Sequence, residues 1–147
     1  MKISTKGRYA LRMLADIAAH RGDGYIALKT IADRQEVSKK YLEQIVPVLT
    51  HGGLLITNRG HQGGYMLARK PEDITVGEIL RLTEGGLEPV ACMVGDPTAS
   101  SCPRNATCPT LPVWQGLYET VTKYLDGITL ADVSDNLKGN PADNYVI

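Results

Sequence analysis

The stretch "LKTIADRQEVSKKYLEQIVPVLTHGG", residues 28–53, decides the fold of this chain. It carries two apolar stripes at helical spacing, formed by Leu28, Ile31 and Ala32 and then by Leu42, Ile45, Val46 and Leu49. Between the stripes, "QEV" breaks the pattern and Ser38 is a favourable N-cap for the second helix. Gly52 and Gly53 close that helix, as glycine commonly does at a helix C-terminus. Two helices joined by so short a turn predict a helix-turn-helix.

The second helix has the side chains of a recognition helix. Polar residues crowd its N-terminal turns, where such helices contact base edges and phosphates: Lys39, Lys40, Tyr41, Glu43 and Gln44. Pro47 lies inside this helix and removes one backbone hydrogen bond, so we expect a kink or an early tightening there. The N-terminal half of the helix is left intact.

Flanking segments complete a winged domain. Residues 5–21 have helical periodicity, with Ser4 or Thr5 as the N-cap. Residues 54–58 and 65–69 read as two strands around a glycine-rich turn, and a hairpin in this place is a wing. Three polar residues at its tip suit insertion into a minor groove: Arg59, His61 and Gln62. Alone, the tip also fits an ordinary solvent-exposed turn.

Charge separates the two halves of the chain, although the formal net charge is zero. Residues 1–70 hold twelve Lys and Arg against five Asp and Glu, a balance of +7, and residues 71–147 hold four against eleven, a balance of −7. This asymmetry favours a polyanionic partner for the first half, although an unevenly charged solvated surface would look similar. Together with the helix-turn-helix, it predicts binding to double-stranded DNA.

The length of 147 residues fits one domain with an appendage and a core that needs no disulfides. We expect no secretory signal, because Arg12 and Asp16 interrupt the apolar N-terminal run, and no membrane span. A cytoplasmic protein is expected, in which clustered cysteines favour metal or redox chemistry. All three cysteines lie between residues 91 and 114: Cys92, Cys102 and Cys108.

The second half of the chain adds a capped helix, a cysteine loop and a long helix. Thr75 and Glu78 form a capping box for a helix over 75–84. The strongest periodic signal of the chain follows the loop, in a stripe that exceeds the needs of a small winged domain: Trp114, Leu117, Tyr118, Val121, Tyr124 and Leu125. We expect this stripe to form a dimer interface, with an ordinary core helix as the alternative.

The expected fold is mainly α with a small β-hairpin. Its parts are a winged helix-turn-helix domain over 1–84, a sensor loop over 85–109, a dimerisation region over 110–133 and a flexible tail over 134–147. "GITLADV" in the third part predicts a short closing helix.

Three segments together resemble the IscR/CymR/NsrR-type family of bacterial winged-helix regulators: "MKISTKGRYALRMLADIA", "SKKYLEQIVPVLTHGGLL" and "RGHQGGYMLARKPEDITVGEIL". The resemblance runs from Met1 to about Asp132. It implies a homodimeric transcriptional regulator, usually a repressor. It also implies the DNA contacts: Ser38, Tyr41, Glu43 and Gln44 in the major groove, Arg59 and Gly60 in the wing, and Lys6 and Tyr9 near phosphates.

The same resemblance implies that the three cysteines hold an iron–sulfur cluster whose type stays open. Two features depart from the cluster-binding pattern. The gap between Cys92 and Cys102 is long, and the two usual places of a fourth ligand hold Leu111 and Arg8. Asp96 or an exogenous group is then the expected fourth ligand.

Other functions remain open at this point. The same regulator could sense thiol oxidation or cysteine status without a cluster, because three cysteines can form one disulfide and leave one thiol. A thiol enzyme is less favoured, since the chain has no Cys-x-x-Cys motif and no histidine near the loop, and no enzymatic activity is expected. Zinc is disfavoured by the wide ligand spacing.

Overall fold

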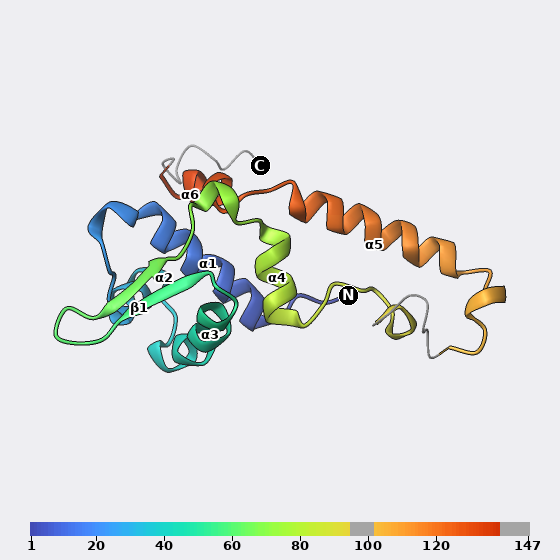
Figure 1. Ribbon diagram of the computed structural model, residues 1–147, viewed down its shortest axis with the longest axis horizontal. Coiled ribbons are helices and arrows are strands. Elements are labelled where there is room, and N and C mark those ends of the chain that lie inside the picture. The colour runs from blue at the N-terminus through green and yellow to red at the C-terminus, as the bar shows by residue number, and fades with distance from the viewer. Residues whose placement is uncertain (95–101, 139–147) are drawn as a thin grey trace.

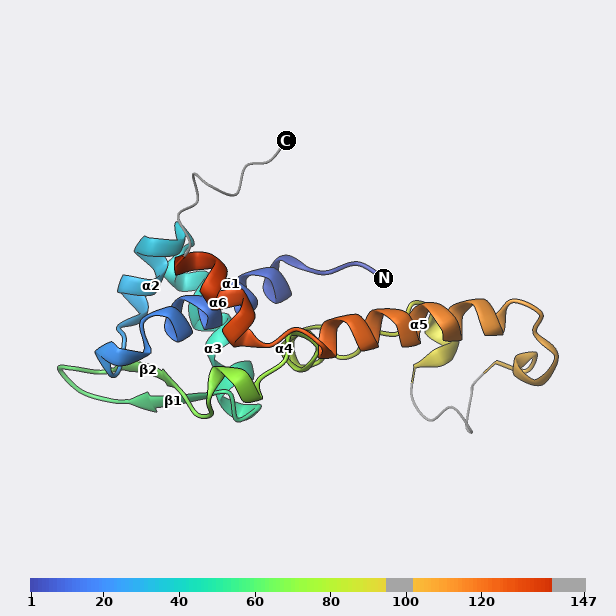
Figure 2. The same ribbon diagram turned by 90° about the horizontal axis from the view of Figure 1, so that it is seen from above.

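The computed structural model describes residues 1–94 and 102–138 (Figures 1 and 2). Within them it has helices and two strands in the order α1 Thr5–Ala19, α2 Leu28–Gln35, α3 Lys39–His51, β1 Leu55–Asn58, β2 Gly64–Leu67, α4 Val76–Glu84, α5 Leu111–Asp126 and α6 Leu130–Lys138. Short 3-10 turns lie at Arg21–Asp23, Pro71–Asp73, Ala91–Met93 and Asn105–Thr107. The expected fold class, mainly helical with one small hairpin, is confirmed.

Helix α1 is the centre of the winged domain. Its apolar face is fully buried and packs against α2, α3, α4, α6 and β2. The Ser4 hydroxyl accepts a hydrogen bond from the Gly7 amide at 3.2 Å, which confirms the predicted cap. The helix ends at Ala19, earlier than the predicted Arg21, because the chain turns into the 3-10 segment over 21–23.

The turn between α2 and α3 has a defined backbone shape. Glu36 takes a left-handed conformation with φ 51° and ψ 44°, and the Val37 amide donates to the Ala32 carbonyl at 3.0 Å. The Ser38 hydroxyl then caps α3 by accepting from the Tyr41 amide at 3.4 Å. Helix α3 continues through Pro47 to His51, and its N-terminal half is intact.

The wing is fixed to the helix-turn-helix by backbone hydrogen bonds. Strands β1 and β2 are antiparallel, with Asn58 opposite Gly64. Next to them, Ile26 and Tyr65 exchange two backbone hydrogen bonds, at 2.9 and 2.8 Å, just before α2 begins. A Cβ on Gly64 would lie 2.5 Å from the Ile26 backbone, so glycine permits this approach. At the tip, Gly60 has φ +130°, a conformation that other residues rarely adopt.

Helix α5 projects from the winged domain as a long arm whose C-terminal end lies on that domain, and α6 packs against the domain (Figures 1 and 2). No residue of α5 is fully buried. The connection from α5 to α6 is attached to the chain at the start of α4 by two backbone hydrogen bonds. The Val76 amide donates to the Ile128 carbonyl at 2.9 Å, and the Leu130 amide donates to the Ile74 carbonyl at 2.7 Å. The described part of the chain contains no helix long and apolar enough to cross a membrane.

Helix α6 corrects the predicted tail. The boundary at residue 134 is wrong for 134–138, which belong to α6, and the closing helix is longer than "GITLADV" indicated. Leu130 and Ser134 are buried, and α6 packs along α1. The polar sequence of residues 134–138 gives no local sign of this helix, because the helix is held by its contact with α1, which is distant in sequence. The remainder of the predicted tail, 139–147, lies outside the described residues.

Candidate nucleic-acid interface and cysteine segment

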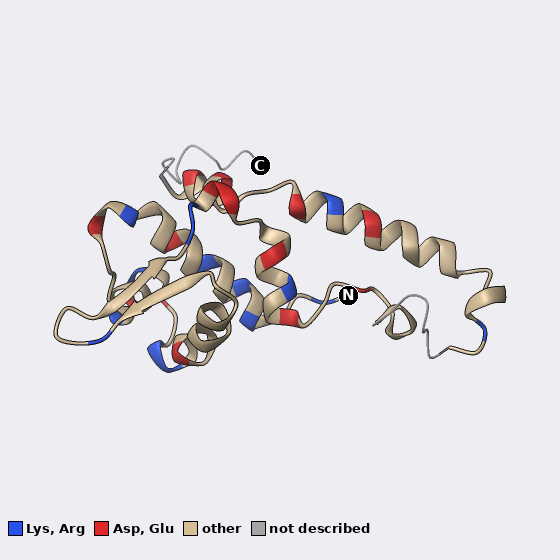
Figure 3. Ribbon diagram, viewed as in Figure 1, with Lys and Arg blue, Asp and Glu red and all other residues tan. Residues whose placement is uncertain are grey.

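A groove of about 580 Å³ runs between α3 and the wing. Lys39 and Glu43 line it from the first turns of α3, and Arg59 and Gly60 line it from the wing. The recognition helix and the wing, predicted separately, therefore share one concave surface. Figure 3 shows Lys and Arg on α1, the start of α3 and the wing, while the acidic residues of α6 are Asp132 and Asp135. The groove is lined by three cations, Lys29, Lys39 and Arg59, and by one carboxylate, Glu43.

The first turns of α3 present their polar side chains to solvent. Lys39, Lys40, Glu43 and Gln44 are exposed, whereas Tyr41 is half-buried. Glu43 and Lys39 form an ion pair at 3.5 Å between side chains that are 52% and 56% exposed. Such exposed pairs contribute little to stability, so they leave both groups free to bind other partners.

The other residues predicted to contact DNA lie at the edges of this surface. His61 is exposed at the wing tip, and Lys6 lies half-buried on α1. Neither lines the groove among the described residues. The rings of Tyr9 and Tyr41 meet edge to face, with centroids 5.5 Å apart. The structure thus brings Tyr9 to the recognition helix.

Lys29 and Asn58 line the groove and were not predicted from the sequence. Lys29 projects from the first turn of α2 and pairs with Asp33 at 3.1 Å. Lys29 is one of the cations of the basic first half. Its place in the groove depends on the bridge between Ile26 and Tyr65, which holds the wing against the start of α2. No local pattern in the sequence reports that bridge.

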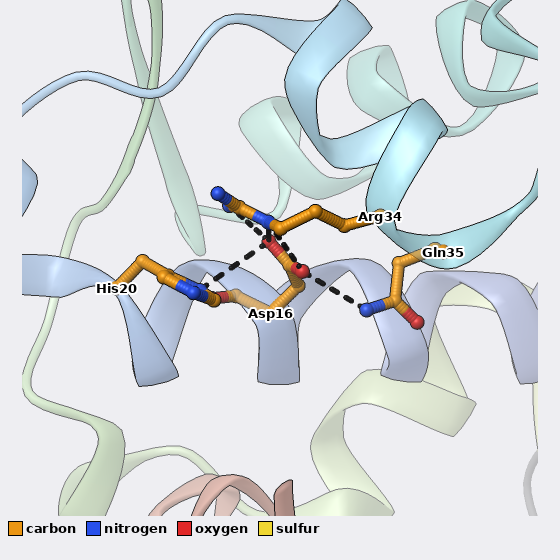
Figure 4. A network of polar contacts seen from close by, with 4 residues as sticks. All are labelled: Asp16, His20, Arg34 and Gln35. Atoms are coloured by element: carbon orange, nitrogen blue, oxygen red, sulfur yellow. Dashed lines mark hydrogen bonds and ion pairs between the residues drawn. The ribbon is translucent and has the colours of Figure 1, made fainter. Parts of the chain in front are cut away.

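A buried polar network joins α1 to α2 and was also missed (Figure 4). Asp16 is 1% exposed, and its carboxylate accepts from Arg34 Nε at 3.0 and 3.1 Å and from Gln35 Nε2 at 2.9 Å. His20 Nδ1 lies 3.7 Å from Asp16 Oδ1. The hydrogen bond to Asp16 raises the pKa of Arg34 above its usual value. The position of Asp16 within the apolar face of α1 could have indicated this network, because a buried charge requires a partner.

The cysteines occupy both ends of the predicted sensor loop. Cys92 lies in the 3-10 turn over 91–93, and Cys108 lies just before α5. All three cysteine side chains are half-buried. In residues 1–94 and 102–138, no three His, Cys, Asp or Glu side chains are placed to hold a metal ion. Asp96, the expected fourth ligand, lies outside the described residues.

The Cys108 thiol lies beside Thr110, at the N-terminus of α5. Its Sγ lies 3.3 Å from Thr110 Oγ1. Hydrogen bonds from the Thr110 hydroxyl, and then from the Thr110 and Leu111 backbone amides, lower the pKa of Cys108 below its usual value, and the positive charge of Arg104 adds to this. Thiolate is the form that binds metals and attacks disulfides, so this environment suits either chemistry.

Helix α5 keeps much of its apolar stripe uncovered. Tyr118 and Leu125 pack against the small cluster of Val76, Leu80 and Leu87 on the winged domain. The rest of the stripe is half-buried or exposed within this chain: Trp114, Leu117, Val121 and Tyr124, with Tyr124 68% exposed. An ordinary core helix would bury these side chains.

The helix-turn-helix, the wing and the shared basic groove define a winged-helix DNA-binding protein. The family model of Rrf2, described as an iron-dependent transcriptional regulator, matches residues 3–136. The chain belongs to this family and is a DNA-binding transcriptional regulator. Relatives of this kind are regulators and not enzymes.

Individual relatives agree with this assignment. The chain is 41% identical over 133 residues to the protein rrf2 of Nitratidesulfovibrio vulgaris, covering 90% of this chain and 87% of that protein. The structure of CymR from B. subtilis, the global cysteine regulator, is 36% identical with a TM-score of 0.74, covering 92% of this chain and 98% of that one. The structure of T. potens IscR is 41% identical with a TM-score of 0.73, covering 93% and 88%.

Replacing Arg59 by Ala tests the wing. Because Arg59 faces the groove from the wing, we expect Arg59→Ala to weaken DNA binding by about 1–3 kcal/mol. The probe is the duplex that the wild-type protein selects from a randomised pool, measured by fluorescence anisotropy. Lys123→Ala, which removes an exposed cation from α5, is the control. Equal losses in both variants would contradict the role of the wing.

Replacing Glu43 by Ala tests base selection. A carboxylate can accept a hydrogen bond from cytosine N4, and the exposed pair with Lys39 holds Glu43 only weakly. We expect Glu43→Ala to broaden the set of duplexes recovered from the randomised pool, as read by sequencing. Asp33→Ala, which breaks a similar exposed pair on α2, should leave that set unchanged. A uniform loss of affinity for all sequences would show that Glu43 does not select bases.

Proposed function

We propose that the protein is a homodimeric repressor whose cysteine segment controls operator binding. The observation that carries this proposal is the position of the cysteines. All of them lie in the segment leading into α5, the helix whose apolar face this chain leaves uncovered. A change at the cysteines would therefore act where the two subunits meet.

The first turns of α3 would enter a major groove, and the tip of the wing an adjacent minor groove. The groove between them is lined by Lys29, Lys39 and Arg59, which supports the passage of one phosphate backbone. In this arrangement Lys40, Glu43 and Gln44 face base edges, while Gly60 and His61 lie at the wing tip. Lys6 would contact phosphate at the margin.

The stripe on α5 would pack against the same stripe of a second subunit. An apolar groove of about 370 Å³ supports this, because it lies where α5 meets the winged domain and is lined by Leu80, Val121, Tyr124 and Leu125, with Met1 and Ile3. A twofold dimer would present two recognition helices to half-sites about 34–36 Å apart.

An iron–sulfur cluster is the proposed signal. Three thiols supply most of a cluster's usual ligands, and a lowered thiol pKa at Cys108 favours metal binding. The described residues do not form a closed ligand set. Binding would require the segment between Cys92 and Cys108 to close, with its remaining ligand taken from Asp96 or from outside the chain.

Contacts of α4 supply a route from the cysteine segment to the wing. Asp126, at the end of α5, pairs with Arg81 of α4. Three residues earlier on α4, Glu78 pairs with Arg69, which follows β2. Movement of α5 in the dimer would thus displace α4 and the base of the wing together.

Thiol oxidation is the second candidate for the signal. The lowered pKa of Cys108 favours it, because attack on another sulfur requires thiolate. It also agrees with the structural similarity to CymR, a cysteine regulator in B. subtilis. This candidate keeps the same dimer and the same DNA surface.

Introducing negative charge into the apolar stripe of α5 tests the proposed dimer. We expect the double change Leu117→Asp, Val121→Asp to give monomers that bind the selected duplex very weakly, because two carboxylates would have to be buried in the interface. Analytical ultracentrifugation measures the mass. Gln115→Asp, Lys123→Asp places carboxylates on exposed positions of α5 outside the stripe and should stay dimeric. A folded dimer from the first variant would place the interface elsewhere.

Anaerobic reconstitution with iron and sulfide distinguishes the two signals. The cluster proposal predicts a coloured protein, and loss of iron and sulfide in each single variant: Cys92→Ser, Cys102→Ser and Cys108→Ser. If the wild-type protein retains no iron, the cluster is excluded. Thiol sensing then requires a disulfide that forms under mild oxidant and appears in mass spectra of the non-reduced protein.

A further inference from the structure

We propose that one face of α1 positions the recognition helix: Tyr9, Arg12 and Asp16 hold the chain on both sides of the turn between α2 and α3. These three residues are spaced at i, i+3 and i+7, so their side chains project from the same side of α1. The inference rests on the proposed role of α3 in reading DNA. It assigns Tyr9 and Tyr41 to holding α3 in place.

Gln35, the last residue of α2, is held at three points before the turn. Its side-chain amide donates to Asp16 Oδ2 at 2.9 Å, and its side-chain carbonyl accepts from Arg12 Nε at 3.3 Å. The Arg12 guanidinium also donates to the Gln35 backbone carbonyl. Both ends of a neutral side chain are therefore bound by α1, which fixes where α2 ends.

Tyr41 is held after the turn, in the first turn of α3. Its ring meets the Tyr9 ring edge to face, with an interplanar angle of 89°. The Arg12 guanidinium lies 5.4 Å from the centroid of the Tyr9 ring, within the range of a cation–π contact. Arg12 thus touches both the residue that ends α2 and the aromatic pair that holds α3.

The turn needs such support because its backbone is strained. Glu36 is the only residue other than glycine with positive φ in residues 1–94 and 102–138. A non-glycine residue in this conformation persists where surrounding contacts fix it. Small rotations at Glu36 would swing the first turns of α3, and hence Glu43 and Gln44, relative to the wing. Base contacts tolerate little such displacement.

Neutral substitutions distinguish positioning from contact with DNA. The probes are the duplex selected by the wild-type protein and a scrambled duplex of equal length, measured over a series of KCl concentrations. We expect Gln35→Leu and Tyr41→Ala each to lower the ratio of specific to scrambled affinity by about tenfold, as the displacement of one base contact would. The salt dependence of binding should stay that of the wild type, because neither change alters charge.

Tyr41→Phe keeps the ring pair and should restore the ratio that Tyr41→Ala loses. Thr30→Ala, an exposed position on α2, is the control. Stoichiometric titration corrects each affinity for the folded fraction, so a loss of stability alone leaves the ratio unchanged. If Gln35→Leu does not fold, the comparison of Tyr41→Phe with Tyr41→Ala decides.

Two results would overturn the inference. One is a wild-type ratio in Gln35→Leu, and the other is a loss in Tyr41→Phe equal to that in Tyr41→Ala, which would place the hydroxyl on DNA. A wild-type protein that shows no preference for the selected duplex would overturn the proposed role of α3 itself, and is distinguishable from both.

Discussion

The helices of the winged domain are joined by a carboxylate buried in its core. Asp16 lies within the apolar face of α1, and a charge in that place is costly unless it is paired and hydrogen-bonded. Arg34 and Gln35 satisfy it, and both belong to the last turn of α2. The angle between α1 and α2 is therefore set by hydrogen bonds with fixed directions, in addition to apolar packing. Removing Arg34 would leave the charge without its cation, and removing Gln35 would take one hydrogen-bond donor from Asp16 Oδ2.

Successive contacts extend this constraint to the DNA surface. The end of α2 leads through Glu36 into α3, and the start of α2 is bridged to the wing through Ile26 and Tyr65. The positions of the recognition helix and the wing thus both depend on α2, and α2 is held by α1. On the opposite side, the pairs of α4 with Asp126 and Arg69 connect the same domain to α5. In the proposed function, a signal at the cysteines would reach the DNA surface through these pairs without unfolding the core.

Local signals in the sequence were sufficient for most elements of the fold. The caps at Ser4, Ser38 and Thr75 were readable because a cap needs only residues a few positions apart. The spacing of apolar residues directly predicted the apolar faces of α1, α3 and α5. What could not be predicted depends on contacts between distant segments. The course of α6 along α1, the partners of Asp16 and the place of Lys29 in the groove are such contacts.

The ligand arrangement in the cysteine segment is also a property that local sequence does not specify. Its three cysteines predicted thiol or cluster chemistry. Whether these side chains can come together around a cluster depends on how the segment folds, and residue types and spacing do not specify that. We propose that the cysteine state of a homodimer controls its affinity for DNA. The most direct measurement is the affinity of anaerobic wild-type dimer for its selected duplex, with and without bound iron and sulfide. A change of about 5- to 150-fold at constant dimer mass is predicted, in the range of ordinary coupling between sites. Equal affinity in every cysteine state, oxidised thiols included, would contradict it.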